Sequence, residues 1–137
     1  MSDDPPRVAD TASWLRKAKE DLEIAKQLAK LPKAYAGGVV FHCQQAAEKA
    51  LKAFLVWHDV PFRKVHYLKE IGDACIGRDV SLQKIVASAV PLTEYAWKFQ
   101  YPGEPEQPSK KEAREALAIA TEVLAEMVKR LPKEVRR

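Results

Sequence analysis

Apolar residues recur at steps of three and four along most of the chain, the spacing that places them on one face of an α-helix. Four segments before residue 100 carry this pattern, and we predict a helix over each: residues 13–31, 35–58, 67–76 and 80–99. Gly77 follows the third of these helices, and Pro91 predicts a kink or a break near Val90 in the fourth. No segment shows the alternation that is typical of a β-strand.

A further helix is predicted after YPGEPEQPS, the proline-rich stretch of residues 101–109. Ser109 stands three residues before Glu112, which is the spacing of a capping box at the start of a helix. The apolar residues between Ala113 and Leu131 then fall on one face. Three long helices and one or two shorter ones predict an all-α protein, an up-and-down bundle of about five helices with a four-helix-bundle core.

A chain of 137 residues has the size of one domain. We expect an N-terminal leader over residues 1–12, the bundle over 13–131 and a basic C-terminal tail over 132–137. The cations near this end, among them Lys129, Arg130 and Lys133, allow two interpretations. They either complement the dipole of the last helix and continue into a solvated tail, or they bind phosphate. We favour the first, because no aromatic residue interleaves them for stacking on bases.

The composition favours a helical protein of the cytoplasm. Alanine accounts for 20 residues and threonine for 3, which is a bias toward helix. Two cysteines are too few for a disulfide framework, and the acidic, proline-containing start does not resemble a signal peptide. No apolar stretch is long enough to cross a bilayer, so we expect no contact with membranes. The net charge of +4 permits contact with nucleic acid without requiring it.

The sequence contains no recognisable catalytic or metal-binding motif. Its three histidines, His42, His58 and His66, do not fall at a spacing that places two metal ligands on one helix face. The five glycines form no phosphate-binding fingerprint. Cys43 lies on the apolar face of the second helix, where we expect an inert core thiol. We therefore expect no metal, no cofactor and no catalytic residue from such motifs.

One side of the second predicted helix is polar and carries two adjacent rows. Gln45, Lys49 and Lys52 line up at steps of four and three, and Gln44 and Glu48 form the neighbouring row. Glutamines beside a strong apolar face suggest polar groups that meet a partner or a ligand. The alternative is a solvated face with a Glu48–Lys52 ion pair worth roughly a few tenths of a kcal/mol. The spacing alone leaves both interpretations open.

The stretch QQAAEKALKAF, from Gln44 to Phe54, resembles the signature helix of HEPN domains, named for higher eukaryotes and prokaryotes nucleotide-binding. Other pieces of the family pattern occur in the expected order: Phe41 before this stretch, Trp14, Ala18, Asp21-Leu22 and Ala25 in the first helix, His66 and Leu68 after the second, and Tyr101-Pro102 before the last. The similarity covers about residues 13–131 and is closest to the prokaryotic stand-alone type.

The resemblance implies a compact bundle of about five helices that often forms a homodimer. Prokaryotic members often bind a minimal nucleotidyltransferase encoded beside them. Some members are metal-independent ribonucleases with an Arg-x4-6-His motif, in which the imidazole moves the 2′-OH proton and the guanidinium stabilises the phosphorane. In this chain only two residues separate Arg63 from His66, and Gln100 takes the place of the arginine in the family's Arg-Tyr-Pro. The ribonuclease motif is therefore missing.

We predict a non-catalytic HEPN protein that forms a homodimer and binds a minimal nucleotidyltransferase, in a toxin–antitoxin-type pair, or a nucleotide-like ligand or RNA. The expected contacts are Gln44, Gln45, Glu48, Lys49, Lys52, His66 and Tyr101. Two alternatives stay open. The first is a metal-independent ribonuclease with a rearranged site around His66. The second is a purely structural dimeric bundle, with a solvated polar face, in which His66 caps or packs a helix and Phe54, Trp57 and Trp97 are candidate anchors.

Overall fold

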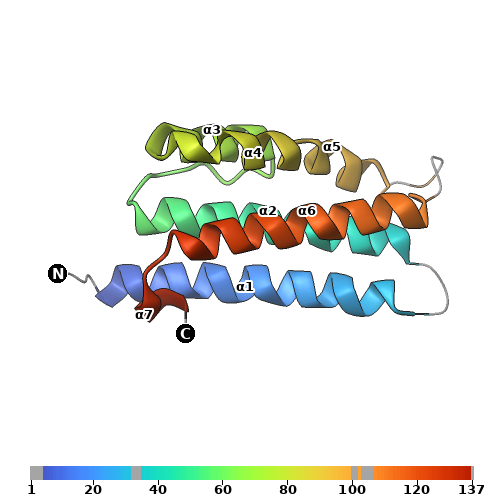
Figure 1. Ribbon diagram of the computed structural model, residues 1–137, viewed down its shortest axis with the longest axis horizontal. Coiled ribbons are helices and arrows are strands. Elements are labelled where there is room, and N and C mark those ends of the chain that lie inside the picture. The colour runs from blue at the N-terminus through green and yellow to red at the C-terminus, as the bar shows by residue number, and fades with distance from the viewer. Residues whose placement is uncertain (1–4, 32–34, 100–101, 103–106, 137) are drawn as a thin grey trace.

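The computed structural model describes residues 5–31, 35–99, 102 and 107–136, and within these ranges every regular element is helical. The three long helices are α1 (Pro5–Ala29), α2 (Ala36–Trp57) and α6 (Lys110–Lys129), which pack alongside one another. Between α2 and α6 the chain forms α3 (Leu68–Arg78), the 3-10 turn η1 (Val80–Leu82), α4 (Gln83–Ala89) and α5 (Pro91–Lys98). These short elements lie on the side of α2 and α6 that faces away from α1 (Figure 1). The predicted all-α bundle is confirmed.

α2 lies at the centre of the bundle, in contact with α1, α3, α5 and α6. Its alanines make this position possible, since Ala46, Ala47 and Ala50 are fully buried and small side chains let neighbouring helices approach closely. Leu51 and Phe54 fill the remaining space. Neither α2 nor any other described helix is both long and apolar enough to span a bilayer.

The helix boundaries follow local sequence signals closely. The predicted capping box of α6 is confirmed: Ser109 Oγ accepts the backbone N–H of Glu112 at 3.0 Å, and Glu112 Oε1 accepts that of Ser109 at 2.8 Å. The predicted break near Val90 is also confirmed, because Pro91 has no N–H to continue the ladder of α4 and instead opens α5. α3 differs slightly, since it continues through Gly77 to Arg78.

The start of α2 is capped by a residue from a distant part of the chain. Tyr35, the N-cap residue, makes no side-chain cap hydrogen bond. Oε1 of Gln107, 70 residues later, accepts the backbone N–H of Gly37 at 2.8 Å, and so satisfies one of the amides that a helix leaves unpaired in its first turn. A Cβ at position 37 would lie 2.9 Å from the same oxygen, so glycine leaves room for this cap.

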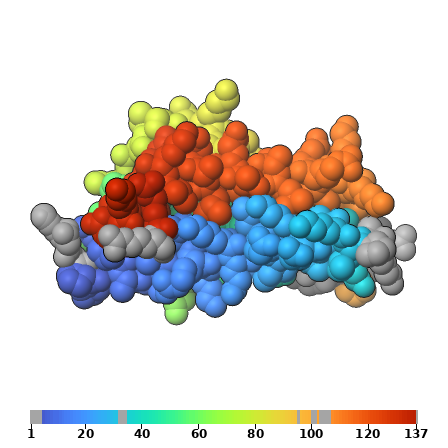
Figure 2. Space-filling view, turned by 60° about the horizontal axis from the view of Figure 1, so that its bottom comes forward, coloured from blue at the N-terminus to red at the C-terminus, as the bar shows by residue number. Residues whose placement is uncertain are grey.

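Both ends of the described chain differ from the sequence-based expectation. Residues 5–12 of the expected leader form the first turns of α1, because proline is tolerated at the first positions of a helix. Residues 133–136 of the expected solvated tail form α7 (Lys133–Arg136), and Val135 is buried with Leu131 against Leu15. Figure 2 shows α7 beside the first turns of α1. The apolar side chains at positions 131 and 135 hold this segment on the bundle.

Candidate functional site

A buried carboxylate lies under the polar face of α2. Glu48 is 2% exposed, and three side chains surround its oxygens. Lys52 Nζ donates to Oε2 at 2.8 Å, Gln44 Nε2 donates to Oε1 at 3.1 Å, and His66 Nδ1 lies 3.1 Å from both oxygens. An ionised carboxylate only accepts hydrogen bonds, so Nδ1 of His66 carries the proton and Nε2 is left as the free position of the ring.

The same row of α2 fixes the segment that leads into α3. Lys52 Nζ also donates to the carbonyl of Val65 at 3.2 Å, and Gln44 Nε2 donates to the carbonyl of His66 at 3.1 Å. The Lys52 ammonium lies 5.4 Å from the ring centroids of both Trp14 and Phe62, within range of cation–π attraction. These contacts position the His66 ring by fixing the backbone on which it stands.

This geometry bears on both interpretations of the polar face. Lys52 pairs with Glu48 and is buried, whereas Gln45 and Lys49 of the same row are half-buried. The Glu48–Lys52 ion pair of the solvated-face alternative is present, but only 6% of the Lys52 side chain is exposed, so this row is not solvated. Contact of Gln44, Glu48 and Lys52 with a ligand or partner would require residues 62–66 to move, because that segment covers them.

A second buried carboxylate joins α1 to α2. Asp21 Oδ2 accepts from Lys49 Nζ at 2.6 Å, and Oδ1 lies 2.8 Å from Nδ1 of His42. The Asp21 side chain is 9% exposed, whereas His42 and Lys49 are 27% and 24% exposed. Gln45 lies next to this cluster and donates through Nε2 to Gln44 Oε1 at 2.8 Å. Asp21 therefore fixes His42 and Lys49 at one atom each, and both side chains remain partly accessible to solvent.

Aromatic rings connect these polar groups to α5. Phe41 meets His42 and Trp97 edge to face, with centroids 5.4 and 5.2 Å apart, and Trp97 lies 5.7 Å from the His66 ring. We call the resulting surface the α2–α5 strip, which consists of Phe41, His42, Gln45, Lys49, His66 and Trp97. Most of these side chains are half-buried, and His66 is the most accessible, with 58% of its side chain exposed.

A family model for the HEPN domain matches residues 11–131, which is most of the chain. The chain belongs to the HEPN family. No curated protein and no solved structure matches the chain. The resemblance predicted from the Gln44–Phe54 stretch is therefore confirmed over nearly the same residues.

Six of the seven predicted site residues of this HEPN domain lie in the two clusters just described, and Tyr101 lies outside the described residues. The sequence-based prediction missed Asp21 and His42 as members of the site, and it considered Trp97 only as a dimer anchor. One signal was available for Asp21, a charged residue on the core side of an apolar helical repeat. The positions of His42 and Trp97 depend on how α1 and α5 pack on α2, which spacing within one helix does not determine.

Arg63, the arginine that stands closest to His66 in the sequence of this HEPN domain, pairs with a carboxylate. Arg63 forms a two-pronged interaction with Glu70 at 3.0 and 2.5 Å on the exposed side of the segment. The hydrogen bond to Glu70 raises the pKa of Arg63, and the same bond lowers the pKa of Glu70. In this conformation the Arg63 guanidinium is paired with a carboxylate on α3.

The cysteines lie in the core and are not part of the α2–α5 strip. Cys43 and Cys75 are both fully buried, as expected for Cys43, and burial raises the pKa of each thiol to about 12. Both thiols are therefore protonated and poor nucleophiles near neutral pH. Within the described ranges, no three His, Cys, Asp or Glu residues are grouped in a way that could hold a metal ion.

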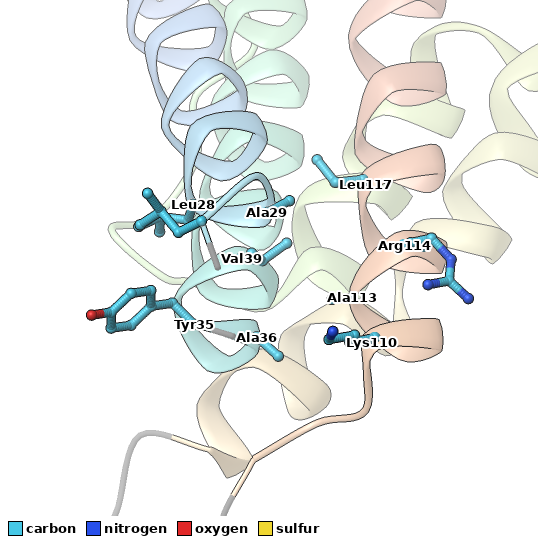
Figure 3. Close-up of a pocket in the computed structure, with 10 residues that line it drawn as sticks. Leu28, Ala29, Tyr35, Ala36, Val39, Lys110, Ala113, Arg114 and Leu117 are labelled. Carbon is cyan, nitrogen blue, oxygen red and sulfur yellow. The ribbon is translucent and has the colours of Figure 1, made fainter. Parts of the chain in front are cut away.

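Several hollows adjoin the described part of the bundle, and two of them differ clearly in size and lining. A groove of about 960 Å³ lies beside His66, between residues 64–69 and the stretch from Val90 to Trp97. A smaller hollow of about 170 Å³ lies where α1 ends and α2 and α6 begin (Figure 3). Apolar side chains line most of the smaller one, and its Arg114 points away from it. The larger groove is therefore the one that adjoins the clustered polar and aromatic groups.

Proposed function

We propose that this HEPN domain is a non-catalytic binding module that dimerises and recognises a minimal nucleotidyltransferase partner or a nucleotide-like ligand. The observation that carries the proposal is the α2–α5 strip, where the buried carboxylates of Asp21 and Glu48 hold His42, Lys49 and His66 beside the aromatic rings. Side chains fixed in this way lose little conformational entropy when they bind.

The free positions of the strip suit a ligand that carries both hydrogen-bond acceptors and donors. Lys49 has three donors, of which Asp21 takes one. His42 and His66 each use Nδ1 on a carboxylate and keep Nε2 available. Gln45 keeps its amide oxygen, because only Nε2 is used. Phosphate oxygens, or carboxylates and carbonyls of a partner, would meet the Lys49 ammonium. A hydroxyl, a base N–H or a backbone N–H would meet Nε2 of the histidines and the amide oxygen of Gln45.

A binding role agrees with the departures from the ribonuclease motif. The Arg63–His66 spacing is two residues, and Arg63 is paired with Glu70. A protein that binds a nucleotidyltransferase without cleaving RNA fits one component of a toxin–antitoxin-type pair, and we propose this setting for the partner.

The test is affinity capture of the tagged protein from the lysate of its own host, with and without nuclease, read by mass spectrometry. We expect a stoichiometric, nuclease-resistant nucleotidyltransferase, which the double variant Gln45→Ala with Lys49→Ala loses. The matched control is Lys26→Ala with Gln27→Ala on the exposed side of α1. Unchanged capture by the strip variant would reject the site assignment, and a dimer that captures nothing and binds no nucleotide would favour the purely structural bundle.

One observation favours the ribonuclease alternative as a second candidate. The buried Glu48 fixes the tautomer of the exposed His66, so that Nε2 is free to accept a proton. If this dyad is catalytic, the purified protein cleaves RNA in the presence of EDTA, and His66→Ala abolishes the cleavage. RNA that stays intact after prolonged incubation would exclude this candidate.

A further inference from the structure

Large apolar side chains are exposed together at one end of the bundle. Ile24, Leu31 and Tyr35 are 36%, 45% and 45% exposed, and they are three of the five exposed large apolar residues in the described part of the chain. Leu28 stands four residues after Ile24 and three before Leu31, so the leucines and the isoleucine share one face. We call these four residues the α1 stripe. A contiguous apolar surface of this kind marks an interaction site more often than single exposed apolar residues do.

The α1 stripe borders a hollow with room for one side chain. The hollow of about 170 Å³ is lined by Leu28, Leu31 and Tyr35 and by residues at the starts of α2 and α6. Val39 of α2 and Leu117 of α6 point into the space between these helices (Figure 3). Small-molecule sites enclose about 300–1,000 Å³, whereas an apolar cavity of about 150 Å³ holds a single benzene ring. The size therefore favours one bulky apolar side chain of another protein over a whole small molecule.

Charges of opposite sign flank the α1 stripe. Lys110 and Arg114 of α6 line the hollow on one side, both are exposed, and neither forms an ion pair with a described residue. Lys110 also stands in the first turn of α6, where the helix dipole disfavours a cation, so the stability of α6 does not explain its position. Glu20 and Glu23 border the stripe on its other side. The apolar surface thus lies between a basic flank and an acidic flank.

We propose that this face binds an amphipathic helix of a partner protein, with one bulky apolar side chain in the hollow and further apolar residues along the α1 stripe. Charge complementarity defines the partner: its helix carries acidic residues toward Lys110 and Arg114, and basic residues toward Glu20 and Glu23. Two copies of this chain that met antiparallel through their stripes would bring like flanks together, which disfavours that arrangement. The face shares no residue with the α2–α5 strip, so the inference does not depend on the proposed function.

Fluorescence anisotropy with two labelled helical peptides tests the charge pattern on the intact chain. Both peptides carry leucines at steps of three and four. The mixed peptide has glutamates on one side of this apolar seam and lysines on the other, and the basic peptide has lysines on both sides. We expect the unaltered chain to bind the mixed peptide roughly twofold to fivefold more tightly. The double variant Lys110→Glu with Arg114→Glu should reverse this preference, a change that non-specific apolar binding would not produce.

The apolar part of the proposal has its own matched pair of variants. Leu31→Glu places a charge on the α1 stripe and should weaken the binding of both peptides roughly tenfold or more. Val80→Glu places the same charge on an exposed apolar residue of η1, outside this face, and should bind both peptides as the unaltered chain does. Both substitutions alter exposed side chains, so each variant is expected to fold.

The outcomes decide for or against this face. Equal affinity of the unaltered chain for the two peptides, equal losses in Leu31→Glu and Val80→Glu, or no binding of either peptide would overturn the proposal. Sedimentation of the same variants tests the other occupant: a dimer that only Leu31→Glu dissociates would assign the face to a second copy of the chain, and it too would overturn the proposal. A dimer that persists in Leu31→Glu agrees with it.

Discussion

Both carboxylate oxygens of Glu48 lie 3.1 Å from Nδ1 of His66, a residue 18 positions later in the chain. The relationship joins a buried group of α2 to an exposed one in the segment that leads into α3, and Lys52 completes the cluster. The polar face of α2 thus has two functions: it stabilises the fold and it orients the one histidine that reaches the groove.

Removing this carboxylate should be costly. Glu48→Ala leaves the Lys52 ammonium buried without its charge partner, and we expect the free energy of unfolding to fall by about 3–5 kcal/mol. Urea denaturation followed by circular dichroism measures the difference. Glu70→Ala, which breaks an exposed ion pair in the same part of the chain, is the control and should change little. Equal stabilities of the two variants would contradict the assigned burial of the cluster.

Two glycines of α3 should respond in opposite ways to the same substitution. A Cβ at Gly72 would lie 2.4 Å from Val86 Cγ1, whereas at Gly77 it would meet nothing within 4 Å. Alanine gains about 1 kcal/mol over glycine in a helix, so Gly77→Ala should raise the thermal midpoint. Gly72→Ala should lower the thermal midpoint, because the added methyl group would press against Val86 and such overpacking costs about 1–3 kcal/mol. A rise in both midpoints would show that α3 and α4 are not packed this closely.

Acid should weaken the contact between η1 and α6. Hydrogen bonds from Ser81, and then from Arg130, lower the pKa of Asp79 below its ordinary value of 3.8. A lowered carboxyl pKa in the folded state means stability that is present above the ordinary pKa and is lost as pH falls through the folded value. The thermal midpoints of Asp79→Asn and the unaltered chain should therefore differ near neutral pH and converge once the pH has fallen below the folded pKa of Asp79. Glu115→Gln, at an exposed position of α6, serves as the control.

The buried thiols offer a simple probe of the core. Since burial raises the pKa of Cys43 and Cys75 to about 12, neither should react with an alkylating reagent at pH 8 while the chain is folded. Both should react quickly in denaturant. Rapid labelling under native conditions, counted by mass spectrometry, would mean that α2 and α3 open readily.

Structural features that depend on residues within one helix could be predicted from the sequence. The Ser109–Glu112 box depends on three successive peptide units, and the break at Val90 depends on the missing N–H of Pro91. The apolar spacing likewise identified the helices. These features are local, so no knowledge of the neighbouring helices is needed.

The arrangement of the candidate site depends on contacts that cross the bundle. The i,i+4 spacing places Lys52 beside Glu48, but only the covering segment around Val65 makes their ion pair buried instead of solvated. The positions of Trp97 and the groove depend on how α5 packs after its break. The sequence therefore predicted most of the residues of the clusters, but not which of them are buried and which remain accessible.

Because of the hydrogen bond between Gln107 and Gly37, the exchange of one amide proton depends on the order in which two parts of the chain fold. α2 has no side-chain cap of its own at Tyr35, so its first turn is completed only when the segment before α6 has docked. The exchange of the Gly37 amide with solvent should then follow the docking of α6 and not the formation of α2. One backbone amide would thus report whether two parts of the chain 70 residues apart have come together.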